Sequence, residues 1–179
     1  MMRKIVNYAL FQAGWFFGLL LAAHGWPVVA LAAAGAAIGV SVWLFSADRT
    51  SDLRLLLAIA LIGFCVESVN LWLGVFSLVG ASRFPHLCPL WLAAQWALFG
   101  TTLRVSLSWL AGRYALSALL GAIWGPLTYV AGEKLGAASL SADRAFSVTV
   151  LAVVWAAMMP LFIWLAHRGR SLHQKEPRT

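Results

Sequence analysis

Apolar residues gather into six long segments along the chain, and short polar loops separate them. The segments cover residues 5–23, 28–45, 55–79, 89–110, 114–132 and 147–166. A helix needs about 20 mostly apolar residues to cross roughly 30 Å of hydrocarbon, and each segment comes close to that length. The pattern predicts an all-α polytopic membrane protein, a six-transmembrane-helix bundle with short loops. Residues 1–167 would form one transmembrane domain and residues 168–179 a polar cytoplasmic tail.

The composition of the chain agrees with a membrane protein. Hydrophobic residues make up 62% of the 179 residues and charged residues 11%, against roughly 45–50% and about 25% in soluble domains. A disordered chain is excluded, and a soluble fold could not cover so apolar a surface. The two cysteines, Cys65 and Cys88, form no C-x-x-C pair, so neither a disulfide framework nor a thiolate metal site is predicted.

The basic residues predict the orientation of the spans, because loops rich in Lys and Arg stay in the cytoplasm. With the N-terminus inside, three basic residues fall on outer loops, namely Arg83, Lys134 and Arg144. Nine fall on inner segments: Arg3, Lys4, Arg49, Arg54, Arg113, Arg168, Arg170, Lys175 and Arg178. We therefore expect a multi-pass protein of the inner membrane with both termini cytoplasmic. The net charge of +7 then reflects topology and contact with anionic membrane lipids, and no nucleic acid is expected as a partner.

Small residues in the fifth segment predict close helix packing. Ser117, Gly121 and Gly125 follow one another at four-residue spacing, and small residues let helix backbones approach in lipid. Two interpretations are open, a dimerisation face and packing within one bundle; the second is favoured here, and the oligomeric state stays open. The tryptophans are expected to lie mostly at lipid or at the interface, and not around one cofactor: Trp15, Trp72, Trp91, Trp109, Trp124 and Trp155.

Two ionisable residues lie inside predicted spans, where such groups are functional candidates because they are costly to bury in hydrocarbon. Glu67 is in the third span and Arg104 in the fourth. In an antiparallel hairpin their depths differ by about 3 Å or about 9 Å, depending on the end from which they are counted, so an intramembrane ion pair is expected. Asn70, Gln12 and Thr101 complete the candidate polar site. It is either a structural clamp or a substrate, headgroup or proton site, and Arg104 could instead extend to the headgroups.

Motifs of enzymes and metal sites are absent from the sequence. It contains no H-E-x-x-H, no phosphate loop and no G-x-S-x-G, and its four histidines are scattered. No metal and no cofactor are predicted, and a non-enzymatic role is favoured. A weak similarity between residues 12–18 and 95–100 is interpreted as chance, so no internal repeat is predicted.

Three stretches, taken in order, resemble a bacterial inner-membrane family known only as domain of unknown function 2878. The first is Asn7-x-x-x-Phe11-Gln12-x-x-Trp15-Phe16. The second runs from Pro89-Leu90-Trp91 through residues 99–103 to residues 106–110. The third covers residues 121–129 and 132–136. The resemblance spans nearly the whole chain, although it leads us to expect an aspartate in place of Glu67 and an asparagine in place of Arg104.

The resemblance implies no activity, but it suggests a link to envelope-lipid modification. The leading hypothesis is a non-enzymatic or accessory inner-membrane protein whose partners are membrane lipids and lipid-modifying enzymes. A small transporter with an intramembrane Glu67–Arg104 polar site is the first alternative. The second is a membrane-embedded enzyme that acts on lipids, with Glu67 as the acid and Arg104 holding an anionic headgroup.

Overall fold

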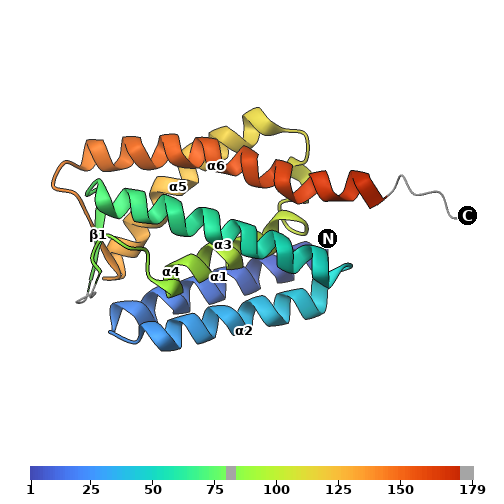
Figure 1. The fold of residues 1–179 in the computed structure, drawn as a ribbon, viewed down its shortest axis with the longest axis horizontal. Coiled ribbons are helices and arrows are strands. Elements are labelled where there is room, and N and C mark those ends of the chain that lie inside the picture. The colour runs from blue at the N-terminus through green and yellow to red at the C-terminus, as the bar shows by residue number, and fades with distance from the viewer. Residues whose placement is uncertain (80–83, 174–179) are drawn as a thin grey trace, which may run out of the picture.

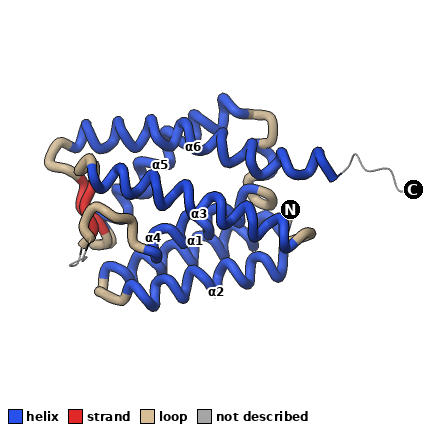
Figure 2. The backbone as a smooth tube through the Cα atoms, viewed as in Figure 1, coloured by secondary structure: helices blue, strands red, loops and turns tan. Residues whose placement is uncertain are grey.

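The fold is a helical bundle with a small two-stranded ladder at one end. The computed structural model describes residues 1–79 and 84–173, so Arg83 and residues 174–179 of the predicted tail lie outside the described residues. Six α-helices cover most of the described chain (Figures 1 and 2): α1 Met2–Ala23, α2 Pro27–Phe45, α3 Arg49–Trp72, α4 Leu90–Leu103, α5 Tyr114–Lys134 and α6 Arg144–His173. The α6 helix therefore continues into the first six residues of the predicted tail.

Five of these helices are long and apolar enough to span a membrane, and α4 is not among them. The prediction of a helical membrane protein is confirmed at this level, but the six-span bundle is not. The α4 helix has 14 residues and is only about 21 Å long. It ends early because hydroxyl groups compete for its last carbonyls: Thr101 and Thr102 each donate to the carbonyl three residues earlier, which favours turns over continued helix. A 3₁₀ turn, η1 Ser108–Leu110, follows.

The helices form two groups that meet at α4. One group contains α1 and α2, which pack on each other and on α4, and the other contains α5 and α6, while α3 packs along α4. The N-terminus and the C-terminal end of α6 lie at the same end of the bundle, and the β-ladder lies at the opposite end (Figure 1).

The α3 helix begins and ends earlier than the hydrophobic pattern predicts. Its first turn is capped by Asp48, whose side chain accepts a hydrogen bond from Ser51 N at 3.0 Å, so the helix begins within the predicted charged loop. It ends at Trp72 because Gly74 adopts φ +67° and Val75 N donates back to Asn70 O, a Schellman C-cap. The residues beyond it form strand β1 Phe76–Leu78, which the sequence had placed within the third span.

The order of elements in α3–β1–α4 occurs again in α5–β2–α6. The α5 helix also ends in a Schellman cap, at Gly136 with φ +80°, and leads into strand β2 Ala138–Leu140. Residues 73–78 read LGVFSL and residues 135–140 read LGAASL. The two strands pair antiparallel with Ser77 opposite Ser139. The units α3–β1–α4 and α5–β2–α6 share this order of elements and this junction sequence, and we call them the two repeats. They are not the segments 12–18 and 95–100, whose weak similarity is interpreted as chance.

Candidate functional site

Glu67 is the centre of a buried polar network where the two repeats meet. Its side chain is 1% exposed and accepts hydrogen bonds from three donors. Trp96 Nε1 lies 2.9 Å from Oε1 and Asn70 Nδ2 lies 3.2 Å from Oε2, and the Tyr129 hydroxyl donates to Oε1. The residues come from α3, α4 and α5, so one carboxylate joins three helices. The sequence analysis placed Asn70 beside Glu67, but it missed Trp96 and Tyr129.

Two glycines allow Trp96, one of these donors, and Trp155 to pack closely against neighbouring helices. A Cβ at Gly63 would lie 2.2 Å from the Trp96 ring, and a Cβ at Gly125 would lie 2.2 Å from the Trp155 ring. Only glycine permits so close an approach, and the two indoles stack with centroids 4.7 Å apart and planes 12° apart. The Gly63–Trp96 and Gly125–Trp155 contacts occupy equivalent places in the two repeats. The repeat interface thus directs the Trp96 N–H toward Glu67.

A cavity of about 570 Å³ lies beside this network and is lined mainly by α1, α4, α5 and α6. Its size is within the range of sites for small ligands. The cavity reaches the protein surface, because several of its lining side chains are exposed, among them Tyr8, Trp109, Trp124 and Leu127. The rim residues lie on α1, on α5 and in the segment that joins α4 to α5, so the opening lies between these elements.

Aromatic side chains dominate the wall of this cavity. Eleven of them line it: Tyr8, Phe11, Trp15, Phe76, Trp91, Trp96, Phe99, Trp109, Trp124, Tyr129 and Trp155. Five of the six tryptophans that were expected to be separate therefore surround one cavity. Trp72 is different, because it is 71% exposed on α3. Tryptophans from distant segments lie together here because the helix pairs fold back on each other. The spacing of the tryptophans in the sequence does not reveal this arrangement.

Gln95 is the second polar residue of the cavity wall. It is 5% exposed, and neither its Oε1 nor its Nε2 has a hydrogen-bond partner among the described residues. Its amide lies against Gly18 of α1, where a Cβ would come within 1.8 Å of Nε2. A buried polar group without a partner costs about 1–3 kcal/mol, so such a group at a cavity wall is suited to a bound molecule. Gln12 lies on α1 at the same cavity and is exposed.

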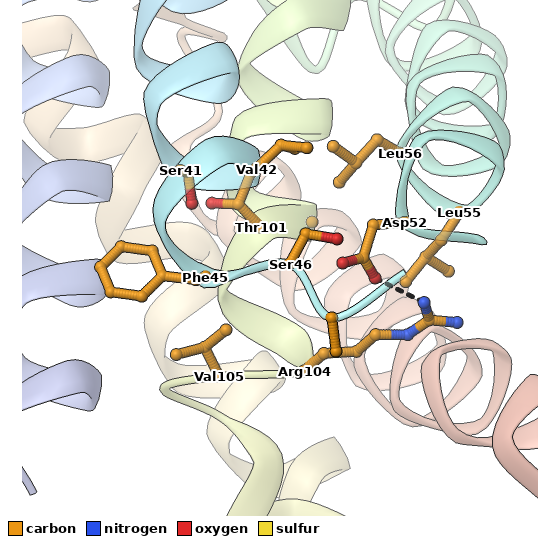
Figure 3. Close-up of a pocket in the computed structure, with 12 residues that line it drawn as sticks. Ser41, Val42, Phe45, Ser46, Asp52, Leu55, Leu56, Thr101, Arg104 and Val105 are labelled. Atoms are coloured by element: carbon orange, nitrogen blue, oxygen red, sulfur yellow. Dashed lines mark hydrogen bonds and ion pairs between the residues drawn. The ribbon is translucent and has the colours of Figure 1, made fainter. Parts of the chain in front are cut away.

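Arg104 belongs to a different cluster at the opposite end of α3. Its guanidinium lies 2.5 Å from Asp52 Oδ1 (Figure 3). It also lies 3.0 Å from Ser51 Oγ, and its Nε donates to Ala166 O at 2.8 Å. Asp52 precedes Glu67 by 15 residues on the same helix, about 22 Å along its axis. The predicted Glu67–Arg104 pair is therefore not formed. It failed because α4 ends at Leu103, so that Arg104 caps the helix near the bundle end instead of lying inside a long span.

Thr101 lies with Arg104 in a small pocket of about 40 Å³ (Figure 3). Its carbonyl accepts a hydrogen bond from Asn7 Nδ2 at 3.3 Å, and Asn7 also donates to Ser41 Oγ at 3.1 Å. Ser106 Oγ donates to Asn7 Oδ1 at 2.5 Å. These contacts tie α1, α2 and α4 together at the N-terminal end of the bundle. The five predicted site residues thus separate into two groups. Glu67 and Gln12 line the cavity and Asn70 donates to Glu67, whereas Thr101 and Arg104 lie in this end cluster.

The sequence of the chain matches a known family over most of its length. Residues 4–161 match the family described as "Protein of unknown function (DUF2878)". The chain belongs to this family. No curated protein and no solved structure gives a significant match. Functional conclusions for this DUF2878 chain therefore come from its geometry.

The small residues of α5 face α6 in this DUF2878 fold. A Cβ at Gly121 would lie 2.3 Å from Trp155 O, and the Gly125 contact with Trp155 follows one turn later. Ser117, one turn before, is fully buried. The stripe therefore packs within one chain. Across the described ranges, 1–79 and 84–173, no group of three His, Cys, Asp or Glu side chains could hold a metal ion.

Proposed function

We propose that this protein takes up a hydrophobic or amphipathic molecule from the membrane into the cavity beside Glu67. The observation that carries the proposal is the aromatic cavity itself, about 570 Å³ in volume and reaching the surface between α1 and α5. Its walls are apolar apart from a few polar groups, chiefly Glu67 and the unpaired Gln95 amide. This combination is typical of sites that hold an apolar body and orient it by a few polar contacts.

We also propose a membrane location and an orientation for this protein. Nine of the thirteen basic residues fall on the predicted inner segments, which include both termini, and this distribution supports a bacterial inner-membrane protein with both termini in the cytoplasm. A cytoplasmic reporter and a periplasmic reporter, each fused after Arg170, test this orientation. We expect activity from the cytoplasmic reporter only, and activity from the periplasmic reporter would contradict the topology.

Binding without chemistry fits an accessory role better than an enzymatic one. Among the described residues that line the cavity, none is Ser, Cys or His, the side chains that most often act as catalytic nucleophile or base. We infer an accessory protein that presents or sequesters a membrane molecule, with envelope-lipid modification as the process that it serves and lipid-modifying enzymes as its partners.

Transport is a second candidate function, and one observation favours it. The cavity and Glu67 lie where two structural repeats meet, at Glu67–Tyr129 and at the Trp96–Trp155 stack. Many transporters place their substrate site at the interface between such repeats. Uptake of the bound molecule into sealed proteoliposomes would favour transport, and binding without uptake would favour the accessory role.

A pair of leucine substitutions tests the uptake of a membrane molecule. At Gly132, which lines the cavity and is buried, an added Cβ meets no atom within 4 Å. A leucine at this position therefore starts in open space at the cavity wall, and we expect its side chain to occupy part of the cavity. Gly35→Leu on α2 is the matched control, because its Cβ also meets no atom within 4 Å and the position is exposed outside the cavity.

Native mass spectrometry of the detergent-solubilised proteins gives the readout. The wild type and Gly35→Leu should retain the same co-purified hydrophobic molecule, and Gly132→Leu should lose most of it. Equal retention by all three proteins would contradict uptake into the cavity.

A further inference from the structure

The charge of the cavity wall narrows the class of molecule that can bind. We propose that the occupant carries a positively charged nitrogen on a hydrophobic body, as a lipophilic amine or quaternary ammonium does. This inference rests on the proposed uptake of a membrane molecule and specifies the chemistry of that same site.

The first reason is that Glu67 accepts hydrogen bonds from neutral donors and has no cationic partner among the described residues. Its three neighbours, Asn70, Trp96 and Tyr129, are neutral donors. The ion pairs Arg104–Asp52 and Arg144–Glu133 do not include Glu67. Buried carboxylates normally pair with a cation. Because Glu67 lines the cavity, a cation bound there would lie beside its carboxyl group and would stabilise the ionised form.

The second reason is the remaining lining of the cavity. Among the described residues that line it, none is Lys, Arg or His, so an anionic head group would find no positive partner and would meet Glu67 instead. Six of the lining residues are tryptophans, whose ring faces attract cations more strongly than those of other aromatic side chains. Both features select a cation over a phosphate, and they also select a cation over an uncharged head group.

The same ammonium chemistry occurs in two sources, a free lipophilic cation and the head group of a zwitterionic phospholipid. The phospholipid also brings a phosphate, for which the described lining offers no basic residue. We therefore expect the free cation to bind better than a lipid that carries the same ammonium group next to a phosphate.

A series of probes with one chain length and different head groups tests the inference on the wild-type protein. The probes are dodecyltrimethylammonium, dodecanol, dodecyl phosphate and a lysophosphatidylcholine with a dodecanoyl chain, each offered at equal concentration in maltoside micelles and counted by native mass spectrometry. The ammonium probe should exceed dodecanol by about tenfold in affinity, as one to two cation–π contacts allow. Dodecyl phosphate should bind most weakly, and the lysophospholipid should fall below the free ammonium.

Two variants complete the test. Glu67→Gln keeps the shape of the side chain but removes its charge, so the preference for ammonium over dodecanol should shrink; if this variant does not fold, the wild-type series alone still decides. Gly132→Leu should lower the binding of all four probes. Equal binding of ammonium and dodecanol, or stronger binding of the phosphate, would overturn the cation inference and leave hydrophobic uptake standing. If Gly132→Leu binds all four probes as well as the wild type does, the proposed function is overturned as well.

Discussion

Tyr129 of α5 donates its hydroxyl hydrogen to the carboxylate of Glu67 of α3, across 62 residues of sequence. The two residues occupy equivalent positions in the two repeats, since the same offset relates Gly63 to Gly125 and the glycine caps at Gly74 and Gly136. This hydrogen bond therefore crosses the repeat interface at the cavity wall. Its removal should loosen the interface as well as the polar network.

Tyr129→Phe should lower the free energy of unfolding by about 1.5–3 kcal/mol, because it removes a hydrogen bond to a buried carboxyl group. Combining it with Glu67→Gln in a double-mutant cycle should give a coupling energy of about 1–2 kcal/mol. The measurement is equilibrium unfolding in mixed micelles. Tyr114→Phe, at an exposed position on the same helix, is the control and should change the stability by less than about 0.5 kcal/mol. Additive losses from Tyr129 and Glu67 would show that the two side chains do not interact.

The ion pair of Arg104 predicts a contrast with the ion pair of Arg144. Arg104 and Asp52 have side chains 10% and 21% exposed, whereas Arg144 is 63% exposed beside Glu133. Arg104→Gln should destabilise the protein by about 1.5–3 kcal/mol, because it leaves Asp52 and Ala166 O with weaker partners. Arg144→Gln should cost no more than about 1 kcal/mol. Similar losses in thermal unfolding would contradict the distinction between the two clusters.

A second outcome follows from the separation of Arg104 and Glu67 into different clusters. The double variant Arg104→Gln with Glu67→Gln should lose the sum of the two single losses, since distant sites without shared partners act additively. Recovery of stability in the double variant would mean that the two charges compensate each other, as the sequence alone had predicted.

Gly121→Leu should destabilise the packing of α5 on α6. Its Cβ would lie 2.3 Å from Trp155 O and 2.9 Å from Met159 Cβ, and backbone cannot move aside as a flexible side chain can. We expect a loss of about 1–3 kcal/mol or more, seen as a lower melting temperature in detergent. Gly35→Leu is the matched control and should melt close to the wild type. An unchanged melting temperature for Gly121→Leu would place this face of α5 against lipid.

Cys88 should react slowly with thiolate-specific reagents. Burial, with a smaller contribution from the nearby Glu67 carboxylate, raises the pKa of the Cys88 thiol to about 12. At pH 8 only about one thiol in ten thousand is then ionised, and the thiolate is the reactive form. In a Cys65→Ser background, the alkylation rate should rise about tenfold per pH unit from pH 7 to pH 10. A rate that levels off near pH 9 would contradict the buried environment of Cys88.

The helical architecture was predictable because hydrophobic length is a strong property of the sequence. The residues at which the helices begin and end were less predictable than the helices themselves. Asp48 and its bond to Ser51 start α3 before the hydrophobic run begins, which an N-cap pattern could have indicated. The glycine at 74 ends α3 inside the apolar run, and only comparison with the LG–SL pattern at residues 135–140 would have indicated why.

The candidate site was predictable in part. Glu67 and Asn70 lie one helical turn apart, so their contact follows from the helix itself. The donors Trp96 and Tyr129 come from other helices, and pairing them with Glu67 requires the three-dimensional repeat. Gln95 was available as a polar residue within a span, but the lack of a partner for its amide depends on the shape of the cavity. Arg104 was assigned to the wrong partner because the end of α4 could not be located from hydrophobicity.

In the proposed function, a membrane molecule occupies the cavity beside Glu67. An experimental density map of the protein, crystallised from a lipidic mesophase without added ligand, tests it most directly. We predict elongated density between α1 and α5 that runs along Trp91 and Trp155 and ends near Glu67. A map of Gly132→Leu obtained in the same way should lack this elongated density. A wild-type cavity that holds only ordered water, or that closes by contact of α1 with α5, would contradict the claim.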